Sequence, residues 1–222
     1  MGAKPRIIAP AMVSRPDTVT GTDGVARCFW AGASPLYTNY HDVEWGMPVD
    51  SDIRLFEKIC LEGFQSGLSW LTILQKRERF REVFAGFDPA SVARFGSDKV
   101  ASLLNDAGIV RHRGKIESTI NNAQRALELR EEFGSLAAYF WRWQPPRSER
   151  PTQMTRAMLG KLGKTPTSVA LSNDLRKRGW RFVGPTTAYA FMQAMGVVND
   201  HVESCPTRAL CLDARRRFTV PS

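Results

Sequence analysis

Two pairs of cysteine and histidine residues stand near opposite ends of the chain. Twelve residues separate Cys28 from His41, and three separate His201 from Cys205. Zinc takes thiolate and imidazole ligands in closed four-coordinate structural sites, and a His-x3-Cys pair can reach one metal from a helix end or a tight turn. The four residues would supply a complete tetrahedral set. The spacing leaves a second interpretation open, in which they are packed cysteines and ordinary histidines.

A buried carboxylate among aromatic residues could form a binding pocket. Glu62 lies in the run Cys-Leu-Glu-Gly-Phe-Gln, and Trp70 follows about two helical turns later. Aromatic ring faces attract cations and a carboxylate adds Coulomb attraction, so such a pocket would favour a flat cationic ligand. The other aromatic residues considered for it are Trp30, Tyr37, Tyr40 and Trp45. In the alternative interpretation Glu62 caps or ion-pairs on a helix surface and the aromatic residues fill the core.

A basic turn could contact phosphate groups. The stretch 106–115 joins two expected helices through Gly108. Its second half carries three cationic side chains, Arg111, Arg113 and Lys115. Glycine lets backbone amides approach a phosphate, and the start of a helix presents free N–H groups. The turn is therefore a candidate helix-hairpin-helix motif. A helix C-cap followed by a solvated basic turn is the alternative.

Composition narrows the class of protein. The 222 residues are 43% hydrophobic, which can fill a substantial core. No uninterrupted apolar run approaches the ~20 residues of a membrane helix, and the start lacks a signal-peptide core, so we expect a cytosolic protein with no membrane contact. The net charge of +9, from 31 Lys and Arg against 22 Asp and Glu, favours a polyanionic partner such as nucleic acid. Four cysteines do not resemble a disulfide framework.

Helical periodicity accounts for most of the chain after residue 50. Caps and apolar spacing predict helices over about 51–65 and 69–84, with further starts at Asp88, Ser97 and Gly114. A short helix is expected near 136–143, and two more over 168–178 and 186–195. No alternating pattern predicts a strand. The fold class is therefore all-α, with about eight helices.

The expected organisation is one main domain with two extensions. Residues 1–26 carry Pro and Gly without a sustained period, which predicts a disordered extension. Residues 27–206 form the helical domain, and residues 207–222 form a basic C-terminal tail. We expect Cys60 in the core and Cys211 in the tail, with no role for either.

Six motifs occur in the order found in the bacterial type I 3-methyladenine DNA glycosylases, which the chain resembles from Cys28 to Cys205. They are Cys28-Phe-Trp, Tyr37-x-x-Tyr-His-Asp-x-Glu-Trp-Gly, Cys60-Leu-Glu-Gly-Phe-Gln-Ser-Gly-Leu-Ser-Trp, Asp106-Ala-Gly-Ile-Val-Arg-His-Arg-Gly-Lys-Ile, Phe182-Val-Gly-Pro-Thr and Phe191-Met-Gln-Ala-Met-Gly-Val-Val-Asn-Asp-His. Several long motifs in register are far more specific than any one of them.

The resemblance implies an all-helical, helix-hairpin-helix, monofunctional enzyme of base-excision repair. Such an enzyme flips out 3-methyladenine and releases it hydrolytically from damaged double-stranded DNA, without cutting the backbone. It would act as a monomer in the bacterial cytoplasm, associated with the nucleoid through DNA binding. One structural zinc would join the N- and C-terminal segments through Cys28, His41, His201 and Cys205. A non-catalytic, zinc-tethered DNA-binding sensor of alkylation damage is the competing hypothesis.

The resemblance also implies a role for each site residue. Glu62 would be the catalytic carboxylate that hydrogen-bonds the extruded base. The pocket around it would consist of Tyr40 and Trp70 as walls, surrounded by Trp30, Tyr37 and Trp45. The DNA-binding residues would be Gly67 and Leu68, which press into the duplex, and Gly108, Arg111, Arg113 and Lys115, which hold the backbone.

Overall fold

The computed structural model describes residues 15–222, and this part of the chain is mostly helical, as expected. Its α-helices are α1 (Pro35–Val43), α2 (Asp52–Gln65), α3 (Trp70–Val83), α4 (Pro89–Val92), α5 (Ser97–Asn105), α6 (Arg113–Phe133), α7 (Leu136–Trp141), α8 (Arg156–Leu159), α9 (Pro166–Lys177), α10 (Pro185–Ala194) and α11 (Pro206–Arg217). Among the described residues, none of the helices combines the length and apolar character that crossing a membrane requires.

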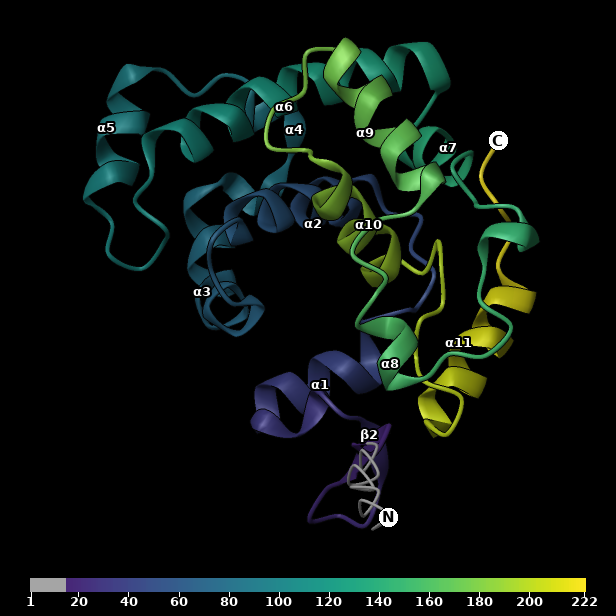
Figure 1. Ribbon diagram of the computed structural model, residues 1–222. Helices are drawn as coiled ribbons and strands as arrows, with labels where there is room; N and C mark the ends of the chain where they lie inside the picture. Colours follow the sequence, from purple (N-terminus) through teal and green to yellow (C-terminus); the bar gives the residue numbers. More distant parts are fainter. Residues whose placement is uncertain (1–14) are drawn as a thin grey trace, which may run out of the picture.

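Helix α2 is the centre of the fold (Figure 1). It packs against α3, α6, α7 and α10, and every residue from Leu55 to Phe64 is buried. Its start is the expected one, because the Ser51 hydroxyl accepts a hydrogen bond from the amide of Arg54. Because α2 is buried on all sides, some of its charged side chains, including Lys58 and Glu62, also lie in the interior. Buried charges of this kind need ion-pair or hydrogen-bond partners.

The N-terminal segment differs from the expected disordered extension. Strands β1 (Thr18–Thr20) and β2 (Ala26–Cys28) pair antiparallel, with Thr18 opposite Cys28. The prediction of no strands is therefore wrong for Thr18–Thr20 and Ala26–Cys28, and the prediction of a disordered extension is wrong for residues 18–26. Residues 1–14 lie outside the described part of the chain. Such short strands carry too little alternating pattern to be found from sequence.

The C-terminal segment is also more ordered than a tail. Helix α11 contacts β2, and the guanidinium of Arg215 lies 4.1 Å from the ring centre of Trp141. Cys211 is only 1% exposed, so the expectation that it sits in a basic tail is corrected. Contacts with residues far away in the sequence hold this helix in place. Local periodicity does not predict such contacts, so the order of this segment could not be predicted from it.

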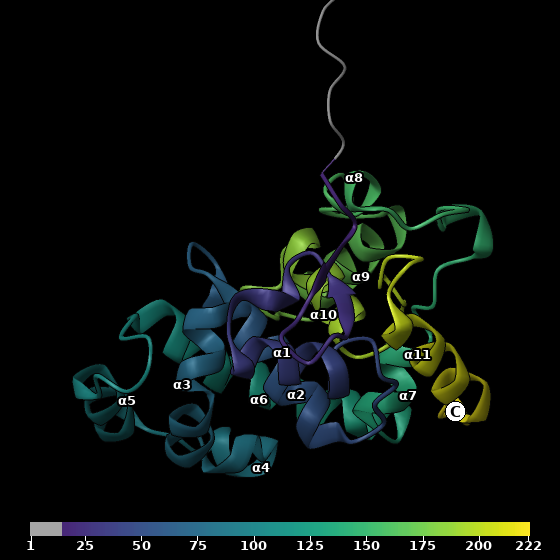
Figure 2. The ribbon, with the colours of Figure 1, turned by 90° about the horizontal axis from the view of Figure 1, so that it is seen from below.

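Helices α5 and α6 flank the basic turn, and the turn is tightly built. The carboxylate of Asp106 accepts a hydrogen bond of 2.7 Å from the amide of Gly108. A Cβ at Gly108 would lie 2.5 Å from Cγ of Arg79, so a side chain would not fit there without a shift. Two helices joined through a glycine turn are therefore present. Figures 1 and 2 both place α5 at the opposite end of the molecule from α11.

Candidate functional site

The four residues of the expected metal set come together in the structure. Cys28 ends β2, His41 belongs to α1, His201 follows α10, and Cys205 is the N-cap of α11. All four are buried, and their ligand atoms lie within 4.8 Å of one another. We call these four residues the Cys/His cluster.

The distances within the Cys/His cluster suit a tetrahedral ion. Bonds of about 2.3 Å to sulfur and about 2.0 Å to nitrogen place neighbouring sulfur and nitrogen ligands about 3.5 Å apart around zinc. Sγ of Cys28 lies 3.5 Å from Nδ1 of His201, and Sγ of Cys205 lies 3.5 Å from Nε2 of His41 and 3.7 Å from Nδ1 of His201. Two thiols and two imidazoles are also the donor chemistry that zinc takes, so the residues fit this metal.

Hydrogen bonds outside the cluster select the tautomer of each histidine. Nδ1 of His41 lies 2.8 Å from the carboxylate of Asp42, and Nε2 of His201 lies 2.9 Å from the backbone oxygen of Trp45. Both partners only accept, so these nitrogens carry the hydrogens, and the other two nitrogens turn their lone pairs toward the cluster, where Nε2 of His41 also accepts a 3.3 Å hydrogen bond from the amide of Cys28. Arg27 in turn donates to Asp42 at 2.9 Å, which makes β2 part of this outer layer.

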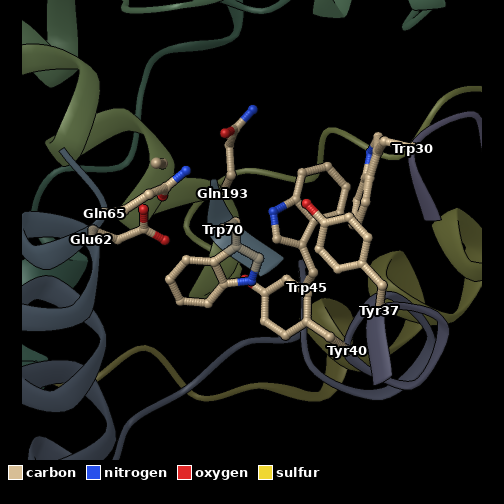
Figure 3. A pocket seen from close by; sticks show the side chains of 9 residues that line it. Trp30, Tyr37, Tyr40, Trp45, Glu62, Gln65, Trp70 and Gln193 are labelled. Carbon is tan, nitrogen blue, oxygen red and sulfur yellow. The ribbon is translucent and has the colours of Figure 1, made fainter. Parts of the chain in front are cut away.

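An aromatic cavity, shown in Figure 3, lies next to the cluster, since Trp30 and Trp45 of its lining contact His41 and His201. Its volume is about 150 Å³. All six residues expected to form the pocket line it, together with three others. The lining residues are Trp30, Tyr37, Tyr40, Trp45, Glu62, Gln65, Trp70, Ala190 and Gln193. Sequence reasoning missed Gln65, Ala190 and Gln193, because an amide or a methyl group on a helix carries no signal of its own.

The Cys/His cluster and the cavity share a wall. The ring centres of Trp30 and His41 are 5.1 Å apart, those of Trp45 and His201 are 4.7 Å apart, and those of the two tryptophans are 4.9 Å apart, all in edge arrangements. Since Trp45 also accepts the hydrogen bond from His201, any metal that orders the two histidines also orders this side of the cavity.

Lys58 is a further residue that sequence reasoning did not find, and it is the buried partner of Glu62. Its ammonium lies 2.9 Å from a carboxylate oxygen of Glu62, donates a 2.6 Å hydrogen bond to the hydroxyl of Tyr40, and lies 3.4 Å from the ring centre of Trp70. The sequence did contain a signal for this ion pair, because residues four positions apart on a helix, such as Lys58 and Glu62, are neighbours on its surface. The pair is buried, since Glu62 is 5% exposed and Lys58 is 5% exposed.

Burial shifts the pKa values of Lys58 and Tyr40 beside Glu62. Loss of hydration lowers the pKa of Lys58, while the neighbouring Glu62 carboxylate opposes the shift. Burial, and next the charge of Glu62, raises the pKa of Tyr40 well above its ordinary value, so the phenol keeps its hydrogen at neutral pH. Because Lys58 donates to the Tyr40 oxygen, the hydroxyl hydrogen is free to donate elsewhere.

The loop between α2 and α3 carries the residues expected to enter DNA. Gly67 has a φ of 81°, a left-handed conformation that favours glycine, and Leu68 is 41% exposed although it is a large apolar residue. Lys115 lies beneath this loop and not on the surface, since its ammonium donates to the backbone oxygens of Phe64 at 2.9 Å and Ser66 at 2.6 Å. The expectation that its side chain holds a phosphate is therefore corrected, because that side chain instead supports the loop.

The remaining basic residues of the turn face solvent. Arg111 and Arg113 are exposed, and within residues 15–222 the one ion pair of Arg113 is an exposed pair of 3.3 Å with Glu117. Such a pair contributes little and leaves the guanidinium available to another anion. These two arginines remain candidates for contact with a phosphate backbone.

The chain is similar to a group of known proteins over most of its length. A family model described as methyladenine glycosylase matches residues 30–209. DNA-3-methyladenine glycosylase 1 of Escherichia coli (strain K12) is 47% identical over 183 residues, which are 81% of this chain and 95% of that protein. The DNA-3-methyladenine glycosylase of Haemophilus influenzae is 41% identical over 185 residues, which are 82% of this chain and 97% of that protein.

Solved structures give the same result. A crystal structure of 3-methyladenine DNA glycosylase I matches with a TM-score of 0.74 at 45% identity, over 81% of this chain and 98% of that one. The Staphylococcus aureus 3-methyladenine DNA glycosylase I, in a structure of 3-methyladenine recognition, matches with a TM-score of 0.74 at 35% identity, over 79% of this chain and 93% of that one. The family match runs from the cavity residue Trp30 past the cluster residue Cys205.

Proposed function

The chain belongs to the methyladenine glycosylase family, and we propose from this that it is a monofunctional DNA glycosylase that releases 3-methyladenine from alkylated DNA. The observation that carries the proposal is the buried carboxylate of Glu62 in the wall of an aromatic cavity. The cavity lies beside the loop between Gln65 and Trp70, which carries the exposed side chain of Leu68, and an apolar side chain there suits the extrusion of a base into the cavity.

The cavity suits the chemistry of this base. Methylation at N3 gives the adenine in DNA a positive charge, which aromatic faces and a carboxylate attract. When the bond between the base and C1′ breaks, its electron pair leaves with the base, which becomes neutral. The oxygen of a water molecule bonds to C1′, and that water loses one proton to the solvent. Glu62 would hold the extruded base by hydrogen bonds, while Tyr40 and Trp70 pack against it. The indole N–H of Trp70 is buried without a partner among residues 15–222, so a bound base would also find a donor there.

We also propose that the Cys/His cluster holds one structural zinc ion. Two sulfurs and two nitrogens from the protein would complete its coordination, so the metal would contribute stability and not a bound nucleophile. It would tie β2 and α1 to the segment around α11 and hold Trp30 and Trp45 in the cavity wall. The residues that would do this are Cys28, His41, His201 and Cys205.

For DNA we propose a helix-hairpin-helix contact. The amides of the turn around Gly108, with Arg111 and Arg113, would hold the backbone, and Leu68 would press into the duplex where the base has left. The substrate would place the protein on the nucleoid in the cytoplasm.

Release of free base tests the proposed function directly. Purified protein incubated with alkylated duplex is expected to release 3-methyladenine and to leave the strands uncut until alkali is added. A non-catalytic sensor of damage would bind the same duplex and release no base, so chromatography of the products decides between the two functions.

Removal of the two exposed arginines tests the DNA contact. The double variant Arg111→Ala/Arg113→Ala is expected to bind duplex more weakly, with little dependence on sequence. If each arginine neutralises one phosphate, the negative slope of log affinity against log salt concentration becomes shallower by about 1.8. The fold should be unaffected because both side chains are exposed.

The matched control is Arg217→Ala, which removes an exposed charge from α11 at the other end of the molecule (Figure 1). It is expected to leave the salt slope unchanged. An unchanged slope in the double variant would refute the contact at the turn.

A further inference from the structure

The amide of Gln193 is held from outside the cavity. Gln193 belongs to α10 and lines the cavity, and its amide nitrogen donates a 2.8 Å hydrogen bond to Oδ2 of Asp200. Asp200 is 0% exposed. The same carboxylate accepts a 2.5 Å hydrogen bond from the Tyr189 hydroxyl and forms an ion pair with Arg150. Nothing in the expected site accounts for this buried network.

The network fixes which end of the amide faces the cavity. The nitrogen and oxygen of a glutamine amide are nearly identical in shape, so their assignment follows from the hydrogen-bond partners. A carboxylate only accepts, and its other neighbours, Arg150 and Tyr189, donate to it. The nitrogen of Gln193 must therefore face Asp200. Figure 3 shows the oxygen of Gln193 on the side of Glu62 and Gln65, with the nitrogen turned the other way.

We propose that Gln193 determines base specificity: its amide oxygen accepts a hydrogen bond from the exocyclic amino group of the extruded adenine, and Asp200 is the residue that positions it. This inference rests on the proposed function and names the feature of the base that the site reads.

The chemistry of the two purines explains the selection. Methylating agents attack N3 of both adenine and guanine. At the sixth ring position 3-methyladenine has an amino group with two hydrogens, whereas 3-methylguanine has an oxygen. The acceptors of Glu62 and Gln193 can share the two hydrogens of the amino group. The guanine oxygen would face the acceptors of Glu62 and Gln193 in place of the two hydrogens that they receive from adenine, so both acceptors would lose their hydrogen bonds to that position.

Gln65 offers a matched control inside the same cavity. It is also a glutamine on a helix that lines the cavity, yet its side chain has no hydrogen-bond partner within residues 15–222. Its amide is free to turn and can present either a donor or an acceptor. We therefore expect Gln65 to contribute no selection between the two bases.

The test compares Gln193→Met with Gln65→Met on one methylated duplex that contains both lesions. Released 3-methyladenine and 3-methylguanine are separated by chromatography and their rates are measured. In Gln193→Met the ratio of the two rates is expected to fall by about tenfold or more, because the adenine rate falls and the guanine rate does not. In Gln65→Met both rates should change alike and the ratio should stay at the wild-type value.

Asp200→Asn provides a second variant, because an amide can donate as well as accept and so lets Gln193 turn. The ratio of the 3-methyladenine rate to the 3-methylguanine rate is expected to fall in this variant as well. Its metal content should equal that of the wild type, which shows that the neighbouring Cys/His cluster is intact. An active wild type with an unchanged ratio in folded Gln193→Met would overturn the role of Gln193 and leave the proposed function intact. A wild type that releases neither base would overturn both.

Discussion

Glu62→Gln is expected to lower the rate of 3-methyladenine release by about 10²- to 10³-fold, which is the usual effect of removing one preorganised electrostatic contact from an active site. The variant keeps the shape of the side chain and removes its negative charge. The cationic base then loses its Coulomb partner, a buried carboxylate whose interactions water screens less than those of a surface charge. Single-turnover release from alkylated duplex measures the effect.

Glu62→Gln also affects stability, because it removes the ion-pair partner of Lys58. Replacement of Lys58 in the same protein provides the control for this effect. Lys58 lies 2.9 Å from the Glu62 carboxylate, and both residues are buried. Glu62→Gln leaves a buried ammonium without a counter-charge, which is expected to cost about 2–4 kcal/mol of stability. Lys58→Met replaces the ammonium by an apolar side chain of similar length against the Trp70 ring. The double variant Glu62→Gln/Lys58→Met should therefore regain stability in denaturant unfolding but not activity.

The two measurements separate catalysis from folding. Recovery of stability without recovery of base release supports a direct contact between Glu62 and the base. If the double variant recovers both, then the loss in Glu62→Gln came from the unpaired lysine, and Glu62 does not have the role proposed for it.

Cys205→Ser is expected to abolish stoichiometric zinc binding and to lower the free energy of unfolding by about 4 kcal/mol or more. Loss of a structural metal is among the few single changes with effects of this size, because metal-binding energy is also folding energy. The readouts are metal analysis of purified protein and its thermal unfolding. Base release should fall too, since the histidines of the cluster pack against Trp30 and Trp45 of the cavity.

Cys211→Ser is the matched control. Cys211 is also buried, and its sulfur lies 3.8 Å from the backbone oxygen of Trp45, yet it is not one of the four clustered residues. This variant should keep one equivalent of zinc and most of its stability. A wild type that folds cooperatively without any metal, or a Cys205→Ser variant that retains full zinc, would contradict the proposed site.

The sequence alone was sufficient where the signal is local. Helices α2, α3 and α4 begin at the predicted starts, where Ser51, Ser69 and Asp88 accept hydrogen bonds from the first turn. Caps and helical spacing involve residues a few positions apart, so they can be read before anything is known of the fold. The members of the Cys/His cluster and six of the cavity residues were named from their types and motifs, because a metal set and an aromatic wall with a carboxylate are chemically unusual.

Tertiary structure decided what depends on distant partners. Lys115 looked like a phosphate ligand until the backbone oxygens of Phe64 and Ser66 were placed around its ammonium. Gln193 had no recognisable role until Asp200 fixed its amide. The cost of burying a polar group is met only by a partner with suitable geometry, and such a partner can come from anywhere in the chain. The residue types were therefore present in the sequence, whereas the pairing that gives each polar group its function arises only when the segments meet.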